Sequence, residues 1–210
     1  MPGRINRLIG AAFLMLAALC SVRPALADAA DPASHFIADL GSRAIGILSD
    51  KSLATEDRRQ QFHVIFVNHF DVPAIGKFVL GRYGRSATPE QMDAYQQVFQ
   101  DYVVSTYNTR LTSYAGQTLD VIGSTPGEEG RTIVKSRINQ PAAGTPPIQV
   151  DWVVTGAEGG FKIIDVVIGG VSMALTQRSE FGSVIQSGGG TVDALITRLR
   201  DQVAAVNEQG

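Results

Sequence analysis

Apolar side chains between residues 31 and 116 recur every three or four positions, which is the period of an α-helix with one buried face. The helices predicted from this spacing are 31–48, 55–70, 71–81 and 88–116. Thr55 is the predicted cap of the second helix. The fourth has the clearest start, because Thr88, Pro89 and Gln91 form a capping box with a first-turn proline. The first half of the domain is therefore predicted to be helical.

After Gly116 the apolar period changes to two, which is typical of strands with one buried face. The predicted strands are 118–122, 131–140, 148–155 and 161–168. Their connections are short and rich in glycine and proline, which favours an antiparallel meander. Two helices follow, one at 176–187 and one capped by Thr191. The predicted class is α+β, with six to seven helices packed on a curved four-stranded antiparallel sheet.

The N-terminus has the pattern of a secretory signal peptide. Arg4 and Arg7 precede an apolar run at 8–19, and residues 24–27 read Pro-Ala-Leu-Ala. We expect cleavage after Ala27, export to the periplasm, and a single mature domain at 28–210. Cys20, the one cysteine, lies in the predicted signal peptide, so the mature domain has neither a disulfide nor a thiolate metal site.

The charge balance narrows the classes of partner. The 210 residues carry a formal charge of −2, and the part after Ala27 has 15 basic and 20 acidic side chains, a net charge of −5. A mildly acidic domain is not a nucleic-acid binder by bulk charge. His63 and His69 are six residues apart, which is not the spacing of a helical metal pair. We therefore expect no metal.

Catalytic patterns are sparse. Ser172 follows a strand, but no histidine follows it, so a strand-to-helix corner is a better interpretation than an esterase nucleophile. Asp165 interrupts an apolar strand. A buried carboxylate there fits a general base or a structural ion pair with an arginine, and the sequence leaves both open.

Aromatic residues gather on the long predicted helix. Phe99 and four of the five tyrosines share its apolar stripe, namely Tyr95, Tyr102, Tyr107 and Tyr114. Such a stripe either fills a core or lines a cavity for a long apolar ligand. Periodicity does not separate the two, because both kinds of residue point inward.

Two blocks of sequence resemble the family of MlaC and the toluene-tolerance proteins, which are periplasmic phospholipid-binding auxiliary proteins. The first block is 79–89, VLGRYGRSATP, with the helix aromatics and Gly116 after it; the second is 164–182. Gly84 departs from the pattern, which has an aromatic beside Tyr83. The resemblance covers essentially all of 28–210.

The resemblance implies an NTF2-like cone that encloses an apolar cavity and holds a phospholipid by its acyl chains. It implies a carrier that is not an enzyme, has no cofactor other than its cargo, and binds no nucleic acid. Its implied partners are an outer-membrane lipoprotein–porin complex and an inner-membrane ABC transporter complex. The resemblance implies that it shuttles phospholipid between these complexes and so maintains the lipid asymmetry of the outer membrane. The alternatives are a carrier of hopanoids or other apolar lipids, and an NTF2-like enzyme that uses Asp165.

The predicted lipid site joins the long helix to the sheet. We expect side chains of the long helix and side chains of the sheet to face each other across this site. The lipid-binding residues predicted are Tyr83, Tyr95, Phe99, Tyr102, Val103, Val150, Trp152, Val154, Ile164 and Val166. Arg82 and Arg85 flank Tyr83 in a polar stretch, and we expect them to contact either a lipid phosphate or an acidic partner surface.

Overall fold

The computed structural model describes residues 31–111, 116–157 and 160–208; the predicted signal peptide lies outside them. The helices are α1 (Pro32–Ser49), α2 (Thr55–His69), α3 (Val72–Leu80), α4 (Pro89–Leu111), α5 (Met173–Ser187) and α6 (Val192–Asn207). The short 3-10 helices are η1 (Gly81–Arg85) and η2 (Glu128–Gly130). The strands are β1 (Thr118–Pro126), β2 (Arg131–Asn139), β3 (Ile148–Ala157), β4 (Gly160–Ile168) and β5 (Val171–Ser172).

The strands form one antiparallel meander in the order β1-β2-β3-β4-β5. The α+β class and the antiparallel sheet are confirmed, but the predicted strand number of four is one too low. Gly169 and Gly170 both have positive φ, 56° and 84°, and this tight turn sends the chain back for the two residues of β5. Two residues are too short a run to show an alternating pattern in the sequence.

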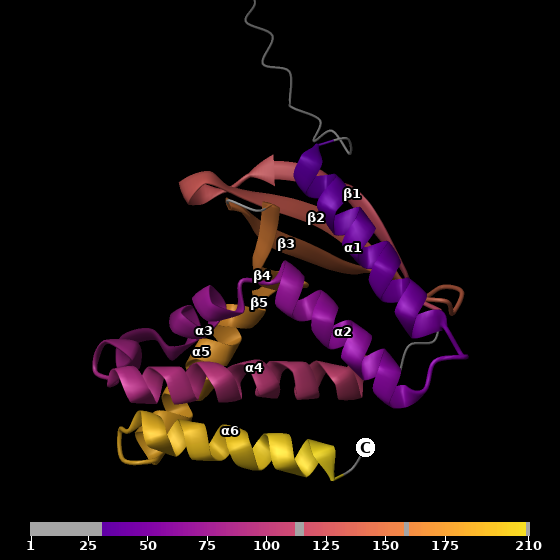
Figure 1. Ribbon diagram of the computed structural model, residues 1–210. Helices are drawn as coiled ribbons and strands as arrows, with labels where there is room; N and C mark the ends of the chain where they lie inside the picture. The colour runs from indigo at the N-terminus through magenta and orange to yellow at the C-terminus, as the bar shows by residue number, and fades with distance from the viewer. Residues whose placement is uncertain (1–30, 112–115, 158–159, 209–210) are drawn as a thin grey trace, which may run out of the picture.

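The helices cover the sheet in two layers. In Figure 1, α1 lies along the sheet, where it contacts β1 and β2, and α2 lies between the sheet and α4. Helices α4 and α6 run side by side at the far edge of the molecule, and α3 packs on α5. Helices α2, α3 and α5 each contact both strand β4 and the helices of the far layer.

The predicted helix starts agree with the structure, except those of α2 and α5. The capping box of α4 is reciprocal: the Gln91 backbone N–H donates to Thr88 Oγ1 at 3.2 Å, and the Thr88 N–H donates to Gln91 Oε1 at 3.0 Å. The prediction that Thr55 caps α2 is wrong. Thr55 is the first helical residue, and Ala54 occupies the cap position without a side-chain hydrogen bond.

Asp31 caps α1 and also ties it to the sheet. One carboxylate oxygen accepts from the N–H groups of Ala33 and Ser34, and the other accepts from the hydroxyl of Ser124 in β1 at 2.6 Å. Burial acts to raise the pKa of Asp31, but the hydrogen bonds from Ser124, Ser34 and Ala33 outweigh it and hold the pKa below 3.8. The ionised carboxylate is therefore the form that the fold stabilises.

The D31N variant tests this link through its pH dependence. A carboxyl whose pKa is lowered by folding stabilises the protein above its unfolded pKa and loses that contribution as the pH falls through the folded value. We expect D31N to cost about 1 kcal/mol of unfolding free energy at pH 7 and less at pH 3, which lies below the ordinary pKa of 3.8. Urea unfolding of both proteins at the two pH values measures the difference. An equal cost at pH 7 and pH 3 would contradict the assignment.

The buried residues form two clusters. The helical cluster is Phe66, Val72, Val79, Leu80, Tyr95, Val98, Phe99, Ala174, Phe181, Ile185, Val192, Leu195, Ile196 and Leu199. The sheet cluster is Ala33, Ile37, Leu40, Ile65, Val134, Val154 and Ile163. Phe70 is partly buried against both. Its ring stacks on Phe66 with centroids 4.5 Å apart, and its backbone bridges to Ile163, so it joins the two clusters.

Candidate functional site

The aromatic residues predicted on the long helix lie in the helical cluster. Tyr95 and Phe99 are 0% and 2% exposed, and both pack against the edge of the Phe181 ring, with centroids 6.4 and 6.1 Å away. The Tyr95 hydroxyl donates to the Gly76 carbonyl at 2.9 Å, and burial raises the pKa of Tyr95. Tyr102 and Val103 pack on the side of this cluster. Tyr95 and Phe99 thus fill a core in this structure.

The sheet residues predicted for the site lie mostly in or against the other cluster. Val154 is part of the sheet cluster, and Trp152 and Val166 pack against it. Ile164 is the extra residue at the bulge between β3 and β4, as Val153 pairs with Asp165 and Val154 with Ile163. The helix and sheet groups therefore lie in separate clusters, and their role in lipid binding stays a prediction.

Val150 is buried on the sheet beside a short polar chain. The Trp152 indole N–H donates to the Ser136 hydroxyl at 2.9 Å, and that hydroxyl donates to the Val150 carbonyl at 2.8 Å. Ser136 is itself 0% exposed. Because both polar groups are satisfied, the indole can lie against the apolar sheet cluster with little cost of burial.

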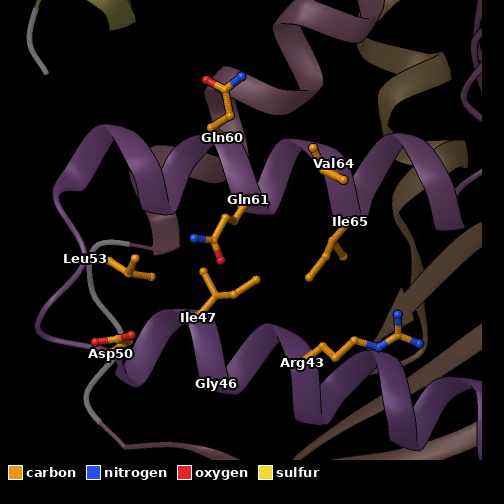
Figure 2. A pocket seen from close by; sticks show the side chains of 9 residues that line it. All are labelled: Arg43, Gly46, Ile47, Asp50, Leu53, Gln60, Gln61, Val64 and Ile65. Atoms are coloured by element: carbon orange, nitrogen blue, oxygen red, sulfur yellow. The ribbon is translucent and has the colours of Figure 1, made fainter.

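A pocket of about 490 Å³ lies between α1 and α2 (Figure 2). Its residues are Arg43, Gly46, Ile47, Asp50, Leu53, Gln60, Gln61, Val64 and Ile65. Figure 2 shows Ile47, Gln61 and Ile65 between the two helices, with Arg43 toward one end and Asp50 and Leu53 at the other. Ile65 belongs to the sheet cluster and Ile47 packs against it, so the pocket has an apolar floor and a polar rim.

The turn from α1 to α2 closes one end of this pocket. Asp50 accepts hydrogen bonds from the Ser52 hydroxyl and backbone N–H, at 2.6 and 2.8 Å. These bonds, with a smaller contribution from the Arg58 charge, hold the pKa of Asp50 below its usual value. Arg58 also donates to the Asp50 carbonyl at 2.9 Å, so the first turn of α2 is fastened to the end of α1.

None of the predicted site residues lines this pocket. The sequence does contain a signal for it: residues 62–67 of α2 read Phe-His-Val-Ile-Phe-Val, which is apolar on more than one helix face. Ile65 enters the sheet cluster and Phe66 the helical cluster, while Val64 is left 50% exposed at the pocket. A helix with more apolar faces than one layer can cover indicates a second contact surface.

Asp165 caps a helix. Its carboxylate accepts from the Ser172 hydroxyl at 2.5 Å and from the Ala174 N–H at 3.0 Å. Ser172 in turn caps α5 by accepting from the Leu175 N–H, so the predicted strand-to-helix corner is confirmed. The alternative of an ion pair is wrong, because Asp165 pairs with no arginine in the described part of the chain. Helix α5 consequently begins three residues earlier than predicted.

The D165N variant distinguishes a capping role from a catalytic one. An amide keeps one acceptor oxygen and turns an N–H₂ group toward the Ser172 hydroxyl, so we expect a loss of about 1–3 kcal/mol of unfolding free energy. The measurement is urea unfolding, with S172A as the matched variant because it removes the other half of the cap. Full stability of D165N together with loss of a hydrolytic or isomerase activity would support the enzyme alternative.

The residues predicted for partner or headgroup contact lie in η1. Arg82 and Arg85 are exposed, and Tyr83 packs against the helical cluster. Tyr114 and the side chain of Tyr107 lie outside the described residues. Within the described ranges no helix is long and apolar enough to cross a membrane. The same ranges contain no group of three or more His, Cys, Asp or Glu side chains that could hold a metal ion.

Fold and pocket together define an α+β domain in which helices on an antiparallel sheet leave an apolar pocket open to the surface. Residues 39–201 match the family model described as MlaC protein. The chain therefore belongs to the MlaC family.

Named relatives and a solved structure agree with this family. The chain is 24% identical to the toluene tolerance protein ttg2D of Pseudomonas putida over 139 residues, which is 66% of this chain and 64% of that protein. It is 26% identical to the intermembrane phospholipid transport system binding protein MlaC of Haemophilus influenzae over 132 residues, 61% of this chain and 60% of that one. The chain thus spans less than two thirds of each.

The solved structure is that of a phospholipid-binding protein from Ralstonia solanacearum in complex with a phospholipid. The two structures superpose with a TM-score of 0.71, and their sequences are 23% identical. The match covers 82% of this chain and 97% of the Ralstonia solanacearum chain. This likeness shows that the two proteins share a fold.

Proposed function

We propose that this protein binds a phospholipid by its acyl chains and carries it through an aqueous compartment. The observation that carries the proposal is the pocket between α1 and α2, whose floor is continuous with the sheet cluster. Each methylene group removed from water contributes about 0.8 kcal/mol to the binding free energy. An apolar pocket can therefore hold a long acyl chain without specific polar contacts. The polar rim suits a lipid whose headgroup stays in water.

The relatives support this choice of cargo. The Haemophilus influenzae relative is named as a binding protein of a phospholipid transport system, and the Ralstonia solanacearum structure contains a phospholipid. The pocket volume of about 490 Å³ lies within the ~300–1,000 Å³ typical of small-molecule sites. Two whole acyl chains need more room, so loading is expected to separate α1 from α2 and expose the sheet cluster to the cargo.

The transport role extends the proposal. We infer that the mature protein is periplasmic and passes phospholipid between an outer-membrane lipoprotein–porin complex and an inner-membrane ABC transporter complex, and so maintains lipid asymmetry. The N-terminal pattern ending at Ala27 and the relatives' names support this role. Carriage itself needs no catalytic group, and Asp165, the strongest candidate for one, is engaged as a cap.

Lipid extraction tests the proposal directly. The protein is purified without detergent, denatured in organic solvent, and the extract is analysed by mass spectrometry. We expect phospholipid in a ratio to protein approaching one, carried over from the expressing cell or taken up from vesicles. Hopanoids in place of phospholipid would identify the alternative cargo. Recovery of no lipid, even after incubation with vesicles, would overturn the carrier function.

A further inference from the structure

A second pocket, of about 310 Å³, lies between η1 and α5. We call it the η1–α5 pocket. Its residues are Leu80, Gly81, Arg82, Tyr83, Arg178, Ser179, Gly182, Ser183 and Gln186. It shares no residue with the pocket between α1 and α2. Two guanidinium groups, two serine hydroxyls, the Tyr83 hydroxyl and an amide therefore surround a space that the proposed lipid carriage does not use.

Both arginines are held by aromatic rings. The Arg82 guanidinium carbon lies 4.9 Å from the centroid of the Tyr83 ring, and its Nη2 donates to the Tyr83 hydroxyl at 2.8 Å. The Arg178 guanidinium carbon lies 5.1 Å from the centroid of the Phe78 ring. Stacking on a ring orients a guanidinium and leaves its N–H groups free to bind an anion in its plane.

Gly81 allows Arg178 to approach η1. Its φ is +59°, and a Cβ atom there would lie 2.9 Å from Arg178 Nε and 3.1 Å from Cζ. Any other residue would thus be strained and would also push the guanidinium away. Because residue 81 is a glycine, the guanidinium group of Arg178 in α5 can lie against the η1 backbone next to Arg82.

The positive charges of this pocket have no carboxylate partner among the described residues. Neither Arg82 nor Arg178 forms an ion pair with a carboxylate in the part of the chain that the structure describes. Glu180, the acid nearest to Arg178 in sequence, accepts instead from the Gln177 amide at 3.1 Å. The mature domain is acidic overall, so this local excess of unpaired cations favours an external anion.

We propose that the η1–α5 pocket binds a phosphate group. Arg82 and Arg178 would donate to its oxygens from two sides, because guanidinium forks match the geometry of an oxyanion. The Ser179 and Gln186 side chains supply further donors at the same pocket. Two sources carry this chemistry, namely inorganic phosphate and the headgroup of a phospholipid in a membrane surface. The proposal goes beyond acyl-chain carriage and is independent of it.

Phosphate titration of the full chain tests the site. Inorganic phosphate is added at constant ionic strength, and the Nε–H signals of the arginines are followed by NMR. The variants are R82Q and R178Q; R198Q, an exposed arginine of α6, removes the same charge elsewhere. We expect each pocket variant to weaken binding at least tenfold and R198Q to change it less than twofold. Equal shifts with chloride, or an equal loss in R198Q, would overturn the proposal.

Vesicles distinguish the two sources. If the ligand is a lipid headgroup, vesicles of phosphatidylglycerol should bind the wild type, release it on addition of phosphate, and retain R82Q and R178Q at least tenfold less. If it is free phosphate, the NMR shifts should persist and the vesicles should neither bind nor compete. Vesicle binding that is equal in all variants, without phosphate shifts, would contradict both sources. The lipid extracted from R82Q and R178Q should match that of the wild type, which separates this result from the carrier test.

Discussion

Replacing Phe99 by alanine is expected to lower the free energy of unfolding by about 3–5 kcal/mol. Phe99 is 2% exposed, stacks on Tyr95 with centroids 5.6 Å apart and meets the edge of Phe181 at 6.1 Å. Removing its ring leaves a cavity whose walls come from α3, α4 and α5 and cannot close without moving these helices. Urea unfolding of the lipid-free protein measures the loss.

The matched control is L175A, because Leu175 is 58% exposed on α5. Its cost should stay within about 0.5 kcal/mol, as for surface substitutions in general. A loss of bound lipid in F99A, with almost unchanged stability of the lipid-free protein, would place Phe99 in a cavity wall after all. That outcome would restore the lipid-binding role predicted from the sequence.

Filling the pocket between α1 and α2 is expected to abolish most lipid binding. Gln61 is exposed at the surface of α2, and Figure 2 shows its side chain between the two helices, toward Ile47. A tryptophan at this position would occupy the volume proposed for the acyl chain and cover the apolar floor. We expect Q61W to retain at least tenfold less phospholipid after extraction, with unfolding free energy within about 1 kcal/mol of the wild type.

Gln97 provides the control for this substitution, since it is an exposed glutamine on α4 that does not line the pocket. Q97W adds the same ring to the surface and should retain lipid as the wild type does. If Q61W and Q97W retained lipid equally, the acyl chain would not enter between α1 and α2. The cavity would then have to be sought between α4 and the sheet.

Much of the fold could be predicted because its signals are local. The Thr88–Gln91 capping box, the Asp71 cap of α3 and the alternation in β3 are each set by a few neighbouring residues. The start of α5 was predicted wrongly because a residue outside the helix decides it. Asp165 comes eight residues before Met173, and its hydrogen bonds to Ser172 and Ala174 start α5 earlier than the sequence pattern indicates.

The residues that line the pocket between α1 and α2 were not predicted from the sequence, for a geometric reason. Periodicity identifies which side chains point inward, but it does not identify which of them meet another side chain and which meet a void. Tyr95 and Phe99 point inward and meet Phe181. Ile47 and Val64 line a pocket between α1 and α2, and the spacing of these helices depends on how each packs on the sheet.

The separation of the buried residues into a helical cluster and a sheet cluster has an energetic consequence for lipid loading. Ile65 and Phe66 are adjacent in α2 but enter different clusters, and the described members of the helical cluster include none from α1, so α1 can separate from α2 while α3, α4, α5 and α6 keep their packing. Such a local opening costs less than global unfolding, and amide hydrogen exchange reports it as faster exchange in α1 than in α4. If cargo enters by this opening, as proposed, the helical cluster preserves the native topology during loading.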